Sequence, residues 1–213
     1  YKEMGFTKET IINALALLGW STENEIFSID ELIESFKLEN VQKAAAVFDL
    51  KRFNWVSSQQ LAKLDENGFF EAIKPFMENE DVNEDYPNYK KILLAMRTSK
   101  TNLKDIAHAT RPFFFELDGY DEKGVKKFLN ESLETLTFAL EVLSKLTEWN
   151  ETELDMALIK VRDYFNLPIP KVNQPMRIAL VGSTVSPSLG LTLELFGKEK
   201  SLERIQKAID FIS

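Results

Sequence analysis

The sequence predicts an all-α fold, and two observations lead to this prediction. Apolar residues recur at helical spacing along most of the 213 residues, and several of these stretches begin with a residue that caps helices well. No alternating strand pattern extends beyond about four residues, which argues against a sheet. With 44% hydrophobic residues the chain can bury a sizeable core, and its length allows one or two domains.

Short helices are expected in the first half of the chain. Thr7 is positioned to cap a helix that runs to Leu18 and stops at Gly19. Ser28 and Glu31 have the spacing of a capping box at the start of another helix. An alanine-rich apolar run over 41–53 follows, with Ala44, Ala45 and Ala46, and then a short helix capped by Ser57 or Ser58 and ending at Leu64. Helices are also expected over 69–77 and 89–96, separated by an acidic loop and Pro87. Asn102 is expected to open another short helix.

A change of texture at Arg111 predicts a loop or domain junction, because Arg111-Pro112 is followed by three phenylalanines and then by Asp118-Gly119. Long amphipathic helices are expected beyond it. Their apolar stripes are Leu133, Leu136, Leu140 and Leu143; then Leu154, Leu158, Val161 and Phe165 behind a capping box of Asn150 and Glu153; and finally Leu202, Ile205, Ile209 and Ile212.

A proline-rich segment separates the last two stripes. Pro168, Pro170 and Pro175 predict a stiff, extended approach to a helix over 176–181, with Pro175 in its first turn. Gly182 is expected to end that helix. A hydroxyl-rich loop follows, in which Ser186 is expected to be the N-cap and Pro187 the first residue of the next helix.

The composition excludes several kinds of site. There is no cysteine, which rules out disulfides and thiolate metal ligands, and a single histidine, His108, argues against zinc sites and histidine-based catalytic triads. We therefore expect no metal site and no catalytic residue. No apolar run reaches the ~18 residues that span a bilayer, and the start of the chain lacks a signal-peptide pattern. Position 1 is not methionine, which suggests a fragment of a longer protein.

The net charge of −8 argues on average against nucleic acid, but the charge is unevenly distributed. No acidic residue lies between Asp163 and Glu194, a window that contains Lys171 and Arg177. Phosphate attraction is screened within ~10 Å, so an RNA-binding face needs only local freedom from acid. A hydroxyl-rich loop beside an arginine can hydrogen-bond base edges and phosphates. A capped helix joined by a polar turn explains the same residues, and is the commoner meaning of such a pattern.

Eight short motifs occur in a fixed order. They are GFT at 5–7, ALALLGWS at 14–21, FSIDELI at 27–33, AVFDLKRFNW at 46–55, QPMR at 174–177, GS at 182–183, SP at 186–187 and LFGKE at 195–199. Their order and spacing resemble the C-terminal half of bacterial glutamyl-tRNA synthetases of class I, over essentially all 213 residues. No single motif is specific, but the combination is.

The resemblance implies three units: 1–62 as the end of the stem-contact region, which braces the inner corner of tRNA, and 63–110 and 111–213 as two consecutive helical anticodon-binding subdomains. The two ATP-binding signatures of the family are absent. The resemblance therefore implies a nucleotide-binding fold upstream of Tyr1, with ATP and Mg²⁺, in a full-length ligase that attaches glutamate to tRNA. It implies that this fragment is non-catalytic, holds no cofactor and has tRNA(Glu) as its partner, as a cytoplasmic monomer without membrane association.

The resemblance also implies which residues contact the anticodon. Arg177 matches the arginine that reaches the anticodon bases. Ser186, Pro187 and Leu189 match the loop that cradles the bases, with the hydroxyl and the helix start as donors and with Pro187 and Leu189 as apolar stacking surface. This is the loop that the charge pattern singles out independently.

Five further residues are candidates for RNA contact. Lys171, Lys198 and Lys200 are candidates for backbone contacts from their charge alone. Family members that read the third anticodon base strictly have an arginine where this chain has Ser99, next to Lys100. A lysine can replace the charge of that arginine but not its bidentate fork. Glutamate and glutamine tRNA both therefore remain candidate partners.

Two other functions compete with this one. A helical protein-interaction adaptor without an RNA role fits the net charge of −8, and predicts no salt-dependent binding of tRNA. A complete small enzyme is disfavoured, because the chain lacks the histidine, cysteine and carboxylate patterns of catalytic sites.

Overall fold

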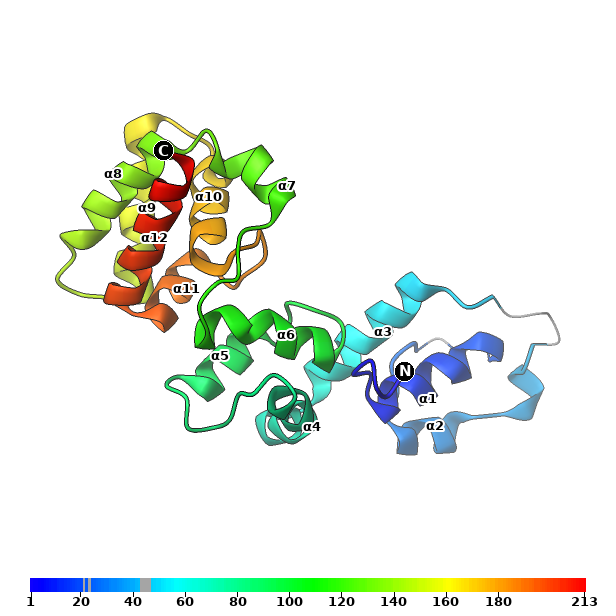
Figure 1. Cartoon of the computed structure of the whole chain (residues 1–213). Helices are drawn as coiled ribbons and strands as arrows, with labels where there is room; N and C mark the ends of the chain where they lie inside the picture. The colour runs from blue at the N-terminus through cyan, green and yellow to red at the C-terminus, as the bar shows by residue number, and fades with distance from the viewer. Residues whose placement is uncertain (21, 23, 43–46) are drawn as a thin grey trace. The chain divides into compact units, whose positions relative to one another are not determined.

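The computed structural model describes residues 1–20, 22, 24–42 and 47–213, which are helical apart from turns and loops (Figure 1). These residues form no strand, and their single β-bridge is isolated and joins Trp20 to Val41. The predicted all-α class is confirmed. The chain divides into two compact units, the N-terminal unit Tyr1–Thr110 and the C-terminal unit Arg111–Ser213.

Some helices of the N-terminal unit begin at the predicted caps Thr7, Ser28 and Asn102. Others begin at Asp49, Asp65 and Asn88, which were not predicted as caps. The helices of this unit are α1 (Lys8–Gly19), α2 (Ile29–Ser35), η1 (Leu38–Asn40), α3 (Leu50–Lys63), α4 (Glu66–Glu78), α5 (Tyr89–Met96) and most of α6 (Leu103–Phe114). Thr7 Oγ1 accepts a hydrogen bond from Thr10 N at 3.2 Å, and Ser28 and Glu31 form the reciprocal capping box. The helices predicted over 69–77 and 89–96 are confirmed as α4 and α5.

Helix α3 begins earlier than the sequence predicts. Asp49 caps it by accepting from Lys51 N at 2.8 Å, and the helix continues without a break to Lys63. The prediction of a short helix capped by Ser57 or Ser58 is therefore wrong. Ser57 is buried inside α3, where its hydroxyl donates to the carbonyl of Thr101.

The alanine-rich run over 41–53 is helical only from Leu50 onward as far as the structure describes it. Ala44, Ala45 and Ala46 lie outside the described residues. The proposed boundary between residues 62 and 63 falls in the last turn of α3, and the three-part division of the chain stays a prediction.

A network of buried amides joins α1, α3 and the segment that precedes α2. Gln60 Nε2 donates to Asn13 Oδ1 and to Phe27 O, both at 2.7 Å, and Asn13 Nδ2 donates to Glu25 O at 2.9 Å. The neighbouring apolar clusters of buried residues are small: Phe6, Ala14 and Phe53 form one, and Trp20, Phe27 and Leu32 form another. Polar contacts therefore provide much of the specific packing in this region.

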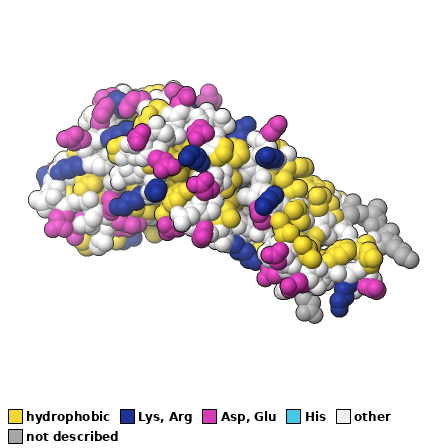
Figure 2. Space-filling model, turned by 90° about the horizontal axis from the view of Figure 1, so that it is seen from below, with side chains coloured by type: hydrophobic (Ala, Val, Ile, Leu, Met, Phe, Trp, Pro, Cys, Tyr) yellow, Lys and Arg dark blue, Asp and Glu magenta, His cyan; other side chains and the backbone are white. Residues whose placement is uncertain are grey.

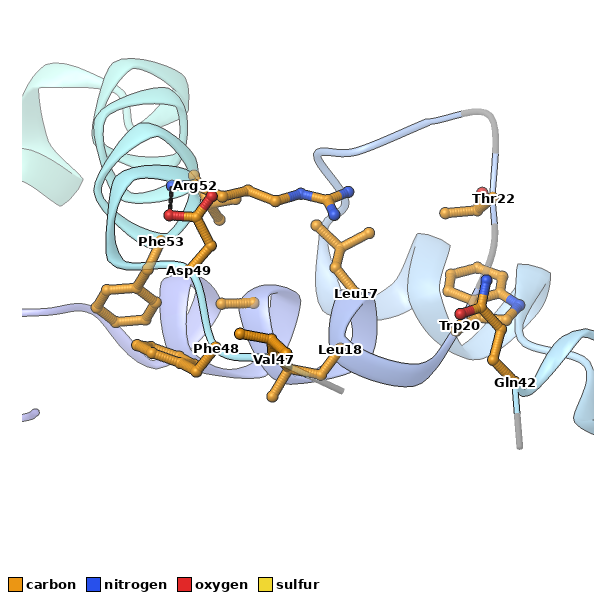
Figure 3. Close-up of a pocket in the computed structure, with 12 residues that line it drawn as sticks. Leu17, Leu18, Trp20, Thr22, Gln42, Val47, Phe48, Asp49, Arg52 and Phe53 are labelled. Carbon is orange, nitrogen blue, oxygen red and sulfur yellow. Dashed lines mark hydrogen bonds between the residues drawn. The ribbon is translucent and has the colours of Figure 1, made fainter. Parts of the chain in front are cut away.

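Residues 1–55 also expose apolar surface. Twelve of the nineteen large hydrophobic side chains described as exposed lie within these residues, and Figure 2 shows yellow side chains gathered over this part of the N-terminal unit. A cavity of about 430 Å³ adjoins α1 and α3, with Leu17, Trp20 and Phe48 in its lining (Figure 3). Arg52 also lines it, and its Nη2 lies 3.0 Å from Glu25 Oε1. Apolar patches of this kind mark interaction surfaces in many proteins.

Helix α6 passes through Arg111, where the sequence predicts a loop or domain junction and where the division into two compact units falls. Asn102 Oδ1 accepts from Asp105 N at 2.8 Å, which confirms the predicted helix start. The helix continues through Arg111 and Pro112 to Phe114, so the loop predicted at Arg111 begins only after Phe114. Tertiary packing outweighs the proline here, because the ring of Phe113 stacks on that of Phe196 at 4.8 Å.

The C-terminal unit is a closely packed helical bundle with a continuous core. Its elements are α7 (Glu122–Gly124), η2 (Val125–Leu129), α8 (Leu133–Ser144), α9 (Glu151–Phe165), α10 (Ile169–Val181), α11 (Leu189–Phe196) and α12 (Lys198–Ile212). Helix α12, red in Figure 1, packs against α8, α10 and α11. The predicted stripes on α8, α9 and α12 have fully buried members in Leu143, Val161 and Ile205, but Leu133 is 39% exposed, so the buried part of the α8 stripe begins only at Leu136.

Helix α10 corrects the prediction made from the prolines. It starts at Ile169 with Pro168 as its N-cap, so the extended approach predicted over residues 168–175 is wrong. Pro170 lies in the first turn, where its missing N–H has no intrahelical partner to lose. Pro175 is buried inside the helix, where one backbone hydrogen bond is lost. Burial of the apolar face of α10 stabilises it despite this loss.

Within the described residues, no helix combines the length and the apolar character needed to cross a membrane.

Candidate RNA-binding site

The turn between α10 and α11 brings together most of the site residues predicted in the C-terminal unit. Gly182 ends α10 in the left-handed region with φ of 72°, and an extended loop over 183–188 follows. The N-cap of α11 is Ser188, whose Oγ accepts from Leu191 N at 3.4 Å. The prediction of Ser186 as N-cap and Pro187 as first helical residue is therefore wrong by two positions. Because Ser186 is not the N-cap of α11, its hydroxyl is available for a different contact.

Arg177 reaches across from α10 to this loop. Its Nε donates to Ser186 Oγ at 2.9 Å, and its Nη2 donates to Pro187 O at 3.1 Å. Among the described residues no carboxylate lies within 4.0 Å of the guanidinium, and Nη1 makes no hydrogen bond. Burial lowers the pKa of Arg177, but an arginine starts so far above neutral pH that it stays charged. The loop therefore holds a half-buried positive charge that no described acid neutralises.

Ser186 orients the arginine and is not a free donor. Its Oγ accepts from Arg177 Nε, lies 3.1 Å from Thr192 Oγ1 and donates to Pro187 O at 3.0 Å. No pattern in the sequence points to Thr192, which lies one turn into α11 and is fully buried. We therefore assign Ser186 to the support of Arg177, whereas the resemblance implied a hydroxyl that faces the bases.

The resemblance implied that Leu189 provides apolar stacking surface, but the exposed apolar side chain at this turn is that of Val185. Leu189 is 2% exposed, so its side chain belongs to the core and offers no stacking surface. Val185 is 45% exposed and lies in the loop itself, next to the half-buried Ser186 and Pro187. Sequence reasoning missed Val185, because a single valine in a polar loop has no distinguishing pattern. Val185 and Pro187 thus provide the apolar surface at the turn.

Carboxylates approach the start of α11 from α9, although none lies nearby in sequence. Glu151 Oε1 accepts from Ser188 Oγ at 2.5 Å. A Cβ placed on Gly190 would lie 2.5 Å from Asp155 Oδ1, which shows how closely α9 approaches the first turn of α11. The acid-free window is therefore acid-free along the chain but not in space. These acids repel phosphate, so we exclude the amides at the start of α11 from the candidate site.

The three candidate lysines of the C-terminal unit differ in whether their ammonium groups are already hydrogen-bonded. Lys198 Nζ donates to Leu146 O at 2.7 Å, and Lys200 Nζ donates to Phe113 O at 3.5 Å. Burial and the nearby charge of Arg204 lower the pKa of Lys200. Both ammonium groups thus support the fold. Lys171 is exposed and has no described partner, so it is the best of the three candidates for an RNA backbone contact.

Ser99 and Lys100 lie in the turn between α5 and α6 of the N-terminal unit. The Ser99 hydroxyl is buried and has no hydrogen-bond partner among the described atoms, while Lys100 is exposed. Arg97, two residues earlier, is engaged with the backbone, since its guanidinium donates to the carbonyls of Leu61 and Leu64. Of the basic residues in this turn, Lys100 is therefore the one that offers its charge to solvent.

Comparison with known proteins agrees with this arrangement. The sequence profile described as "Anticodon binding domain" matches residues 68–209. The chain belongs to the anticodon-binding domain family. The matched residues include the whole α10–α11 turn with Arg177 and Ser186, so the candidate site lies inside the part that defines this family. A second profile, the catalytic domain of class I tRNA synthetases for E and Q, matches residues 1–55.

Relatives of the chain include glutamate–tRNA ligases. It is 33% identical over 219 residues to glutamate–tRNA ligase 1 of Caldanaerobacter subterraneus subsp. tengcongensis, covering 100% of this chain and 46% of that protein. It is 32% identical to the glutamate–tRNA ligase of Thermodesulfovibrio yellowstonii, covering 99% and 47%. The chain thus spans about half the length of these relatives.

Solved structures show the same fold. The glutamate tRNA ligase of Elizabethkingia meningosepticum, solved in complex with its amino acid, superposes with a TM-score of 0.82 at 30% identity, over 100% of this chain and 43% of that one. The glutamate–tRNA synthetase of Elizabethkingia anophelis gives a TM-score of 0.78 at 30% identity, over 99% and 42%.

Proposed function

We propose that this anticodon-binding protein recognises the anticodon of tRNA(Glu), as the RNA-reading part of a glutamate–tRNA ligase. The main observation is the half-buried guanidinium of Arg177, which Ser186 and Pro187 orient and which no described carboxylate neutralises. A half-buried guanidinium whose Nη1 makes no hydrogen bond to a described residue keeps donor capacity for a ligand. The relatives named above are ligases for glutamate and tRNA, which supplies the class of RNA.

Recognition follows from the free edge of the guanidinium. Nη1 remains open to the acceptor oxygens and nitrogens of unstacked bases, which single-stranded anticodons present on their Watson–Crick edges. Nε and Nη2 are already engaged, so the side chain is held in place before RNA binds. Val185 and Pro187 offer apolar surface on which a base can lie. Lys171 and Lys100 supply charge toward phosphates.

The ligase reaction itself requires the catalytic domain, which supplies ATP and Mg²⁺ chemistry. Residues 1–55 match the catalytic-domain profile and expose most of the apolar side chains described as exposed. We infer that this segment packs against a class I catalytic domain, and that the whole is a cytoplasmic monomer. Since Ser99 and Lys100 replace a bidentate arginine, we expect weak discrimination between glutamate and glutamine tRNA at the third anticodon base.

Binding of an unmodified tRNA(Glu) transcript to the 213-residue chain tests the proposal. Arg177→Ala should weaken binding by ~1–3 kcal/mol, which is about 5- to 150-fold, because one base-reading guanidinium is lost. Arg162→Ala is the matched control, since Arg162 lies on α9 of the same unit and pairs with Asp163 at 2.8 Å. A transcript with altered anticodon bases should bind wild type as weakly as the natural one binds Arg177→Ala. Equal binding of both transcripts, or no effect of Arg177→Ala, would refute anticodon recognition here.

A further inference from the structure

Arg204 on α12 is a buried arginine that the anticodon site does not use. It is 2% exposed, and among the described residues no carboxylate lies within 4.0 Å of it. Its Nη1 donates to Leu180 O, and its Nη2 donates to Phe115 O at 2.7 Å. The ring of Phe196 lies 4.5 Å from its Cζ. A buried charge is costly unless it is hydrogen-bonded, so these two carbonyls are its main partners.

The two carbonyls belong to segments far apart in the sequence, and Arg204 bonds to both. Leu180 lies in the last turn of α10, three residues beyond Arg177. The last carbonyls of a helix have no intrahelical donor, and a positive charge there is favourable to the helix dipole. Phe115 is the first residue after α6 and begins the segment 115–121, which leads into the C-terminal unit. Arg204 therefore ties the end of α10 to this connecting segment.

Two further contacts join the end of α10 to the connecting segment 115–121. Asp121 N donates to Gly182 O at 2.8 Å, directly after α10 ends. A Cβ on Gly182 would lie 2.8 Å from Gly119 O, and its φ of 72° is one that L side chains rarely adopt. The connecting segment thus packs tightly against the residue from which the 183–188 loop departs. We call the contacts of Arg204, Asp121 and Gly182 the α10 anchor.

We propose that Arg204 is a positioning residue for the Arg177 site, acting through the α10 anchor without touching RNA. Arg177 lies about one turn before the anchored carbonyl of Leu180, and Ser186 and Pro187 lie six and seven residues after it. If the end of α10 moves, the hydrogen bonds from Arg177 Nε and Nη2 to the loop are lost together. The RNA consequence rests on the proposed function, but the effect on the Arg177 hydrogen bonds does not.

Arg204→Met tests this, because methionine fills much of the same volume and removes the donors. We expect tRNA(Glu) transcript to bind the variant about tenfold more weakly at a temperature well below its unfolding transition. In the Arg177→Ala background the same substitution should have no further effect. Arg162→Met serves as the control for loss of an arginine on the same unit. Unchanged affinity, or an additive loss in the double variant, would overturn the proposal.

A second readout is independent of RNA. The ¹⁵N-detected Nε–H of Arg177 should exchange slowly with water in the wild type, because it donates to Ser186 Oγ at 2.9 Å. Arg204→Met should accelerate that exchange by at least about tenfold. If Arg204 contributed only to stability, the substitution would lower the free energy of unfolding and leave the exchange rate of the Arg177 Nε–H unchanged. If the methionine variant does not fold, Arg204→Lys replaces it. Lysine keeps the charge but not the two-pronged geometry, so we expect an intermediate acceleration.

The two proposals fail in distinguishable ways. If Arg177→Ala binds RNA like wild type while Arg204→Met frees the Arg177 Nε–H, anticodon recognition is wrong and the positioning role stands. If Arg177→Ala loses RNA binding while Arg204→Met changes neither affinity nor exchange, the positioning role is wrong and the proposed function stands.

Discussion

Residues 1–55 and the C-terminal unit differ in how completely they bury their large apolar side chains. Among its described residues, the first segment has two small apolar clusters, a buried amide at Asn13 that bonds to Gln60 of α3, and most of the exposed large hydrophobic side chains described. The C-terminal unit buries side chains such as Leu143, Val161 and Ile205 completely. A core of that kind stabilises a unit by itself, since burial of apolar surface is the dominant favourable term in folding.

The difference matches the family profiles. The C-terminal unit lies within the anticodon-binding match apart from its last four residues, 210–213, whereas residues 1–55 match the catalytic-domain profile of class I tRNA synthetases. A segment of a larger domain is expected to keep apolar surface for the rest of that domain. Substitutions that remove burial, a buried hydrogen bond or a surface ion pair should therefore have unequal effects in the two regions.

The largest effect is expected from Leu143→Ala in the core of the C-terminal unit. Leu143 is fully buried on α8, so the substitution should lower the free energy of unfolding by about 2–5 kcal/mol. Leu15→Ala on α1 is the matched change in the other region, where the side chain is 57% exposed, and should cost less than about 0.5 kcal/mol. Urea denaturation of both variants measures the contrast. Equal losses would show that the exposed leucine is buried in solution, and the comparison would fail.

A smaller effect is expected from Gln60→Leu in the N-terminal unit. The variant leaves Phe27 O without its donor, while Asn13 Oδ1 still accepts from Phe27 N at 3.0 Å. One buried carbonyl left unsatisfied should cost about 1–3 kcal/mol in the same urea assay. Gln59→Leu, at the neighbouring exposed position, is the control and should be nearly neutral. A neutral Gln60→Leu would mean that the apolar clusters, and not the amide network, hold this region.

The smallest effect concerns an exposed ion pair of the C-terminal unit. Lys207 Nζ lies 3.2 Å from Glu116 Oε2, and this hydrogen bond lowers the pKa of the Glu116 carboxyl below its ordinary value. A lowered folded-state pKa gives stability that is present above the ordinary pKa of about 4.3 and is lost as pH falls through the folded value. Both side chains are largely exposed, so solvent screens the gain.

Glu116→Gln removes this contribution. The variant should show a slightly lower urea midpoint than wild type at pH 7, and the two midpoints should converge at acidic pH, once the pH has fallen through the lowered pKa of the wild-type carboxyl. A constant difference at both pH values would assign the effect to packing of the connecting segment and not to the ion pair.

Local signals in the sequence were sufficient for much of the fold. Thr7 and Ser28 with Glu31 form the predicted caps, and the stripes of α8, α9 and α12 reach the core as predicted apart from Leu133, which is exposed. Caps and stripes depend on residues within one or two turns of each other, which is why they can be predicted from sequence. The errors at Ser57, Pro112 and Pro175 share one cause. Each residue disfavours a helix interior locally, and burial of the surrounding helix outweighs that preference.

The sequence by itself determined the helical class, the family likeness and the choice of Arg177 and Ser186, because these depend on local periodicity and on the order of motifs. Only the tertiary structure decided what those residues contact. It paired Arg177 with Ser186, moved Leu189 into the core and brought Glu151 to Ser188 across a gap of 37 positions. It also connected Arg204 to the end of α10. Contacts between distant segments depend on how helices pack, and no spacing along the chain encodes them.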